Sequence, residues 1–285
     1  MAAFYNQASL TYNGNVTNSN ITTGEILEVL SITKSPVTDT YTAGNDVVFL
    51  INITNTGTAA INGLTLTDDL GEYTFGEEDA SAVPLTYMEG TASLFVNGIK
   101  QADPAVVSVS PLTITGINVP AGGNAAVIYA AEPNQFAPLG ENASITNTAS
   151  VSGARATAVT ASSTITADTS VSLAISKSLS PAVVSENGTL TYTFIIQNSG
   201  AVPVTVSDDV IFTDTFDPVL SQLTATFNGA AWTAGTNYTY DETTGVFTSL
   251  PGQITVPAAE VSQDTTTGIW SIQPGVSTIV ITGNI

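Results

Sequence analysis

The chain has 285 residues, of which 24 are Asp or Glu, four are Lys or Arg, and none is His or Cys. With a net charge of −20 the chain has too few basic side chains to neutralise nucleic-acid phosphates or to bind an anionic lipid surface. We therefore expect no nucleic-acid and no membrane partner. Without His or Cys the chain lacks the usual general base near neutral pH and any thiolate, so we expect no conventional enzyme, no metal site and no cofactor.

The chain begins with MAAFYNQASL, which has neither a basic segment nor a continuous apolar run, so we expect no retained Sec signal peptide. Apolar and small polar residues then alternate in runs such as VVFLINIT (47–54), LTITGINV (112–119) and TLTYTFII (189–196). Such period-two runs, rich in β-branched residues and separated by Asn, Gly and Pro turns, predict β-strands. The fold class expected is all-β, built from Ig-like β-sandwiches.

The sequence repeats itself. KSPVTDTYTAGNDVVFLINITNTG (34–57) aligns without a gap on KSLSPAVVSENGTLTYTFIIQNSG (177–200), and LTLTDDL (64–70) aligns on VIFTDTF (210–216). Two copies of one domain are therefore present, beginning near residues 30 and 173.

The two copies end differently. NVPAGGNAAVIYAAE (118–132) aligns on the end of the chain, SIQPGVSTIVITGNI (271–285), but only the first copy continues into a predicted last strand, SITNTASVSG (144–153). We expect a complete sandwich 1 over residues 30–153, a linker over 154–170, and over 171–285 a sandwich 2 that lacks its last strand.

A counterpart of the missing strand lies at the N-terminus. FYNQASL (4–10) resembles ITNTASV (145–151) at alternate positions, and residues 11–29 resemble the connector between the two copies. We interpret residues 1–29 as a donor-strand arm and linker that completes sandwich 2 of another subunit, with Phe4, Ala8 and Leu10 pointing into its core. Head-to-tail repetition of this contact gives an open homopolymer. The alternative, that the arm folds back on its own sandwich 2, is allowed by a reach of roughly 60 Å.

Period two also places polar side chains on apolar strand faces. Lys34 is in phase with Leu30 and Ile32, Lys177 with Leu173 and Ile175, and Asp68 and Asn147 with apolar neighbours on their own strands. Burial lowers the pKa of a lysine and raises that of an aspartate, so a neutral amine can face a protonated carboxyl. The amine can then attack the asparagine side-chain carbonyl, releasing ammonia and leaving a Lys–Asn isopeptide bond, because fixed geometry replaces an outside enzyme. The alternative for each lysine is a buried ion pair.

The ordered motifs, an apolar-x-Lys strand, AGNDVVFLINITNTG, LTLTDDL and ITNTASV, resemble the prokaryotic conserved-repeat Ig-like domain, once called domain of unknown function family eleven. The order Lys, Asp, Asn also resembles the isopeptide-forming Ig-like domains of Gram-positive collagen adhesins and pili. The resemblance implies a Lys34–Asn147 bond promoted by Asp68. In the second copy it implies Lys177 with Asp214 as the acid, although Asp208 has the same phase, and the missing asparagine would be Asn6 of the next subunit.

The sequence thus favours a structural subunit of an extracellular, cell-surface or spore-surface fibre, and resembles subunits of clostridial spore appendages. Its partners would be identical subunits, with tip or anchor proteins possible. The alternative is a tandem-repeat adhesin or S-layer-type binding module that does not polymerise.

Overall fold

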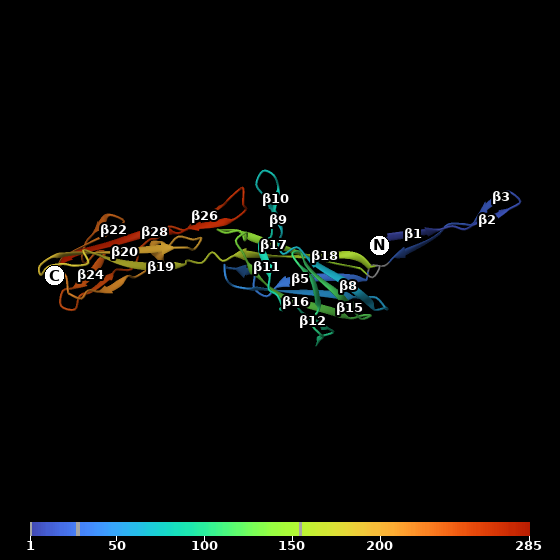
Figure 1. Cartoon of the computed structure of the whole chain (residues 1–285), viewed down its shortest axis with the longest axis horizontal. Helices are drawn as coiled ribbons and strands as arrows, with labels where there is room; N and C mark the ends of the chain where they lie inside the picture. The colour runs from blue at the N-terminus through green and yellow to red at the C-terminus, as the bar shows by residue number, and fades with distance from the viewer. Residues whose placement is uncertain (1, 27–28, 154–155) are drawn as a thin grey trace. The chain divides into compact units, whose positions relative to one another are not determined.

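The computed structural model describes residues 2–26, 29–153 and 156–285, and the chain is almost entirely β-strand (Figure 1). Among the described residues the one helix assigned is a short 3₁₀ turn, η1 (Val206–Asp208). None of them forms a helix with the length and apolar character needed to cross a membrane. The predicted all-β fold class is therefore confirmed.

The chain divides into two compact units, Met1–Tyr73 with Val83–Asn134 and Ile145–Ile165, and Thr74–Ala82 with Gln135–Ser144 and Thr166–Ile285. Sandwich 1 lies mainly in the first unit and sandwich 2 in the second. Besides sandwich 2, the second unit holds two small hairpins, β9 (Tyr73–Phe75) with β10 (Ala80–Ala82) and β26 (Glu260–Gln263) with β27 (Trp270–Gln273).

Sandwich 1 consists of two six-stranded sheets. The first has the order β13 (Ile99–Lys100), β12 (Ser93–Val96), β16 (Asn124–Pro133), β7 (Val47–Asn55), β5 (Leu30–Pro36), with β11 (Leu85–Tyr87) also paired to β16. The second has the order β14 (Ala105–Val109), β15 (Leu112–Val119), β8 (Ile61–Asp68), β17 (Ser144–Gly153), β18 (Ala156–Ala167), β6 (Thr40–Tyr41). Alternate residues of the central strands are fully buried between the sheets, as period two requires.

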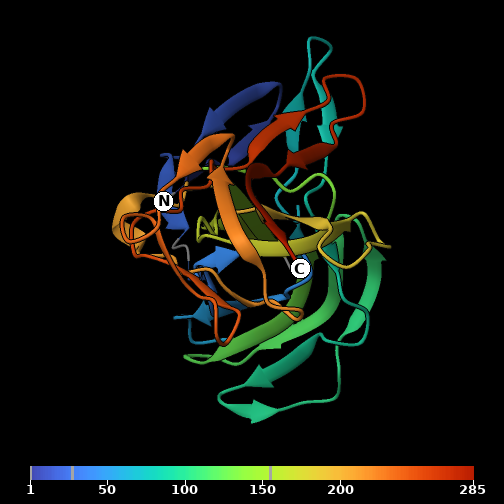
Figure 2. The same cartoon turned by 90° about the vertical axis from the view of Figure 1, so that its left-hand side faces the viewer.

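Sandwich 2 has one sheet of five strands and a facing sheet of only three. The first has the order β19 (Leu173–Ser180), β20 (Thr189–Asn198), β28 (Gly275–Asn284), β22 (Ser221–Phe227), β23 (Ala230–Trp232). The second has the order β21 (Thr213–Thr215), β25 (Val246–Ser249), β24 (Tyr238–Asp241). Figure 2 gives a second view of these strands, in yellow to red. The core of sandwich 2 is rich in aromatic rings, among them Phe194, Phe216 and Phe247.

The linker expected over residues 154–170 is wrong in part, because most of it is β18, which pairs with β17 in sandwich 1. The segment ATAVTASSTITA alternates, and its Ile165 is fully buried. Backbone hydrogen bonding to β17 thus makes this stretch of mainly small residues a strand of the sandwich.

The arm also differs from expectation, since residues 11–29 are not simply a linker. β1 (Ala2–Asn6) pairs antiparallel with β4 (Thr22–Ile26), and β2 (Ser9–Tyr12) with β3 (Asn15–Asn18). The turn between β2 and β3 is Asn13–Gly14, both with positive φ, the chemistry that two-residue hairpin turns favour.

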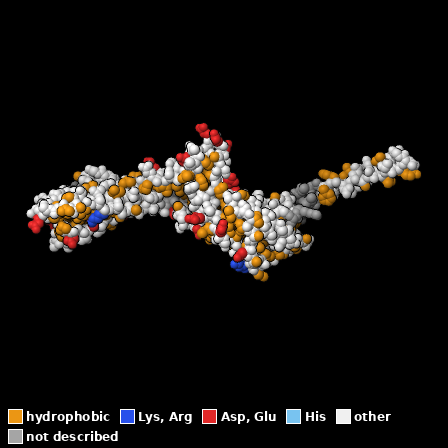
Figure 3. Space-filling model, in the orientation of Figure 1, with side chains coloured by type: hydrophobic (Ala, Val, Ile, Leu, Met, Phe, Trp, Pro, Cys, Tyr) orange, Lys and Arg blue, Asp and Glu red, His pale blue; other side chains and the backbone are white. Residues whose placement is uncertain are grey.

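The surface is poor in ions, as the composition requires. Figure 3 shows a few acidic and very few basic side chains among many uncharged polar and apolar ones. Lys100, one of the four basic residues, lies 3.7 Å from Asp103 in an exposed pair.

Candidate functional site: two Lys–Asp centres

Three strands of sandwich 1 bring the predicted lysine, aspartate and asparagine into its core. Lys34 lies in β5 opposite Ile51 of β7, and Asp68 ends β8 in the facing sheet. β17 runs beside β8 with Ala149 opposite Asp68. Because Asn147 is two residues from Ala149, it points to the same inner face.

The lysine and aspartate are in direct contact. Lys34 Nζ donates a hydrogen bond to Asp68 Oδ2 over 2.6 Å, and both side chains are fully buried. The backbone N–H of Leu70 donates to Asp68 Oδ1 over 3.1 Å. The ring of Phe49 lies under the amine, with its centroid 5.0 Å from Nζ. The pair is thus held in an apolar site away from water.

Tyr129 connects the aspartate to the asparagine, a role that the sequence did not suggest. Its hydroxyl donates to Asp68 Oδ2 over 2.8 Å and accepts a hydrogen bond from Asn147 Nδ2 over 3.0 Å. Asn147 Oδ1 is buried and has no hydrogen-bond partner among the described residues. An unpaired buried carbonyl is costly, and here it belongs to the group that the amine would attack.

Burial controls the protonation of this pair. Desolvation lowers the pKa of Lys34 and is opposed by the charge and hydrogen bond of Asp68. Desolvation also raises the pKa of Asp68, against the effects of Lys34 and of the Tyr129 hydroxyl. Both shifts favour moving the proton from the amine to the carboxylate. The arrangement therefore suits a nucleophilic amine beside an acid that can protonate the asparagine carbonyl oxygen.

A Tyr129→Phe variant tests the tyrosine. It keeps the ring packed against Phe49 and Tyr87, whose centroids lie 5.5 and 6.2 Å away, but removes the group that holds the Asn147 amide. We expect a folded chain, destabilised by roughly 1 kcal/mol, in which fewer molecules have lost ammonia at a given time after synthesis. Intact-mass spectrometry over time measures this, and an unchanged time course would show that the hydroxyl plays no part.

The second repeat has the same ion pair in an open setting. Lys177 Nζ lies 2.6 Å from Asp214 Oδ2, but the side chains are 42% and 19% exposed. The described residues of β19 are all exposed, whereas β5 is buried or half-buried at alternate positions. Of the described strands, only β25 pairs with β21, which carries Asp214, whereas β8 has a partner on each edge. The open edge of β21 corresponds to the edge of β8 that β17 occupies.

The alternative acid, Asp208, is placed elsewhere. It ends η1, is exposed, and accepts hydrogen bonds from the backbone N–H and hydroxyl of Thr205 over 2.6 and 2.9 Å. The backbone bond and then the hydroxyl bond lower its pKa, the wrong direction for a proton donor. The contact with Lys177 belongs to Asp214.

The alignment of the last strands needs a correction of one residue. Tyr129 pairs with Phe49 across β16 and β7, and Ile281 pairs with Tyr192 across β28 and β20. Since Tyr192 is the repeat of Phe49, the repeat of Tyr129 is Ile281 and not Thr282. In sandwich 2 the tyrosine is therefore on β20, at the position of Phe49, and not on β28, at the position of Tyr129. The ring centroid of this Tyr192 lies 4.8 Å from Lys177 Nζ.

The predicted donor residues are exposed in this chain. Phe4 is 53% exposed and Leu10 70% exposed, and Asn6 and Ala8 are exposed as well. Their counterparts Ile145, Asn147, Ala149 and Val151 are all buried in β17. The arm thus carries, unburied, the residue types that occupy the core in sandwich 1.

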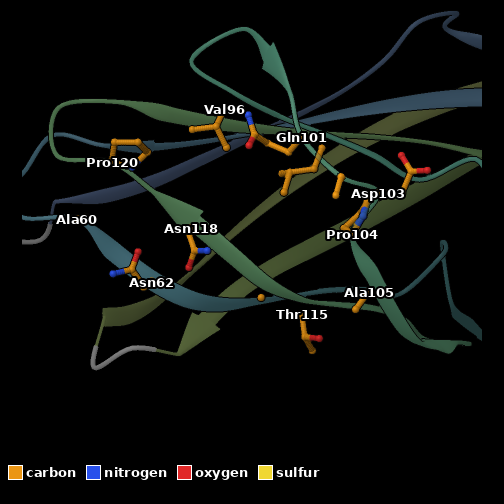
Figure 4. Close-up of a pocket in the computed structure, with 13 residues that line it drawn as sticks. Ala60, Asn62, Val96, Gln101, Asp103, Pro104, Ala105, Thr115, Asn118 and Pro120 are labelled. Carbon is orange, nitrogen blue, oxygen red and sulfur yellow. The ribbon is translucent and has the colours of Figure 1, made fainter.

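A pocket of about 600 Å³ in sandwich 1 is a different kind of site (Figure 4). It lies beside β12, β14 and β15, and its lining mixes apolar side chains with amides. Asn118 accepts a hydrogen bond from the Gly63 backbone N–H, and Asp103 pairs with Lys100 outside it. Its lining residues include no pair of nucleophile and base.

No family model and no curated protein matches the sequence. Among solved structures, the chain is similar to the pilus backbone RrgB of Streptococcus pneumoniae, with 13% identity over 86% of this chain and 54% of that one and a TM-score of 0.30. It is similar to BcpA, the major pilin subunit of Bacillus cereus, with 10% identity over 96% and 73% and a TM-score of 0.35. It is also similar to the collagen-binding domain of the surface protein RspB of Erysipelothrix rhusiopathiae, with 15% identity over 57% of this chain and 58% of that one and a TM-score of 0.27. The chain spans about half the length of RrgB. Scores this low carry no argument about function, which rests on the geometry above.

Proposed function

We propose that the chain is a structural subunit of an extracellular, cell-surface or spore-surface filament. The arm of one molecule completes sandwich 2 of the next, so that identical subunits join head to tail. The observation that carries this proposal is the Lys177–Asp214 pair, which matches Lys34–Asp68 in distance but is left open where sandwich 1 has β17. An exposed apolar strand face with an unpaired edge is a site for strand addition.

Two isopeptide bonds would form: one cross-links sandwich 1 within a chain, and the other joins neighbouring subunits and makes the filament covalent. In each, the neutral lysine Nζ attacks Cγ of an asparagine, the new C–N bond forms, the bond from Cγ to Nδ2 breaks, and the amide nitrogen leaves as ammonia. The leaving NH2 group needs one proton to become ammonia; this proton comes from the amine and passes through the aspartic acid, which ends the reaction in the form in which it began. Lys34 and Asn147 react within one chain under Asp68, and Lys177 reacts with Asn6 of the neighbouring subunit under Asp214. No outside enzyme, metal or cofactor takes part.

Denaturing gel electrophoresis of boiled protein, with the intact mass of each band, tests the proposal. We expect a ladder of multimers in which each bond removes the mass of one ammonia. A Lys177→Ala variant should lose the ladder while its monomer still lacks one ammonia from the Lys34–Asn147 reaction. A Lys100→Ala variant, which changes an exposed lysine, is the matched control and should keep the ladder.

Other outcomes would contradict parts of the proposal. A full-mass monomer in the wild type would return both lysines to the ion-pair interpretation. A monomer that lacks one ammonia and also stays monomeric in native solution would favour the non-polymerising binding module.

A further inference from the structure

The arm is a hairpin whose two strands are in defined register. Phe4 lies opposite Gly24, Tyr5 opposite Thr23, and Asn6 opposite Thr22. The Thr22 hydroxyl donates to the backbone carbonyl oxygen of Asn6 over 3.3 Å. Both strands, and not only the first, are therefore ordered together in the free chain (Figure 1).

Sandwich 1 contains a hairpin in the same register. In β17 and β18 the Thr146 and Thr164 hydroxyls are 2.9 Å apart, and the Thr148 and Ser162 hydroxyls 3.0 Å apart. Residue 147 therefore faces residue 163, and residue 145 faces residue 165. The shift that superposes Asn6 on Asn147 also superposes Thr22 on Ser163, so one shift without a gap relates both strands of the arm to β17 and β18.

The side chains that face the core have changed in a compensating way. Ile145 and Ile165 face each other and are 2% and 0% exposed. In the arm the same two positions are Phe4 and Gly24, and a Cβ atom added to Gly24 would overlap the Phe4 ring. Two medium side chains are thus replaced by one large side chain and none, which conserves volume across the strand pair.

Sandwich 2 also lacks what the second strand would complete. In sandwich 1, β18 lies between β17 and β6, which contains Thr40 and Tyr41. The repeats of these two residues are Val183 and Val184, which belong to no strand within the described stretch 181–188. Val183 is 89% exposed, and Val184 packs on the edge of the sandwich 2 core. An apolar segment is thus left without the strand that its counterpart pairs with.

We propose that each subunit donates a two-stranded hairpin, residues 2–26, rather than a single strand, and that the occupant of the open face of sandwich 2 is this hairpin of a second copy of the chain. β1 and β2 take the place of β17 beside β21, and β3 and β4 take the place of β18, with β4 beside residues 183–184. The Phe4–Gly24 pair fills the space that Ile145 and Ile165 fill in sandwich 1. This inference rests on the proposed polymerisation and adds the identity of the donated element.

Substitutions at Gly24 test it, because they lie in the strand that single-strand donation leaves outside the interface. A Gly24→Ile variant puts a branched side chain where the Phe4 ring lies, and we expect its association constant to fall roughly tenfold or more. The double variant Phe4→Ile with Gly24→Ile recreates the Ile145–Ile165 pair and should restore polymerisation. Thr23→Ile is the matched control, with the same side chain in the same strand, but on the face equivalent to the exposed Thr164.

Polymer formation is followed by light scattering and by the denaturing ladder. Loss with Gly24→Ile and recovery in the double variant would support the donated hairpin. If the wild type and Gly24→Ile polymerise equally well, donation of the hairpin is wrong but donation of a single strand stands. The reason is that Gly24→Ile disrupts the pairing of β4 with β1 while it leaves the residues of β1 unchanged. If wild type does not polymerise at all, the proposed function itself fails.

Discussion

An Asp68→Ala chain is expected to keep its full monomer mass and to unfold far more easily than the wild type. The acid that would protonate the Asn147 carbonyl is gone, so Asn147 releases no ammonia and the Lys34–Asn147 bond does not form. Lys34, whose side chain is fully buried, loses its ion-pair partner. Removing one member of a buried pair typically costs about 3–5 kcal/mol, and a cross-link that closes a loop of about 100 residues contributes about 4.7 kcal/mol in the chain-entropy model.

The two losses can be separated in an Asn147→Ala background, where the Lys34–Asn147 bond cannot form. There, Asp68→Ala should lower the free energy of unfolding only by the cost of the unpaired lysine. Asp103→Ala, which removes the partner of Lys100 in the exposed 3.7 Å pair, is the control and should change stability by less than about 1 kcal/mol. Denaturant unfolding and intact mass measure both effects. An Asp68→Ala monomer that still lacks ammonia would show that another group serves as the acid.

The sequence was sufficient to place the lysine, aspartate and asparagine because each interrupts a clear alternating pattern. Lys34 follows Leu30 and Ile32 in phase, and in β17 the alternation through Asn147 and Ala149 is equally plain. Tyr129 could not be found in this way. It stands in the run VIYA, where consecutive apolar residues fit either face of a strand, and the repeat at 279–281 is equally ambiguous. The sheet register, which depends on pairing with β7 and β20, decides the face.

The second strand of the hairpin was missed for a different reason. β18 and β4 are made mostly of Thr, Ser and Ala or Gly, with only Ile165 as a large buried side chain in β18. Such a composition is as typical of a linker as of a strand near the edge of a sheet. What makes β18 a strand is the backbone of β17 beside it, and tertiary pairing of this kind leaves little trace in the local pattern.

An Ala8→Arg chain is expected to remain monomeric with both of its own sandwiches intact. Ala8 is exposed in the arm, so the substitution leaves the folded parts of the same molecule undisturbed. Its counterpart Ala149 is fully buried and lies opposite Asp68. By the same register, Ala8 would lie opposite Asp214 of the next subunit, where a long cationic side chain has no room and must be desolvated.

Gln7→Arg is the matched control, because it adds the same charge to the neighbouring residue, on the face that corresponds to the Thr148 side of β17. We expect Gln7→Arg to polymerise like the wild type and Ala8→Arg to lose the denaturing ladder and to elute as a monomer. The Lys34–Asn147 mass loss should persist in both, since sandwich 1 contains all of its own strands. Equal polymerisation of the two variants would mean that the arm does not enter sandwich 2 in the β17 register, and the Lys177–Asn6 bond, which depends on that register, would fall with it.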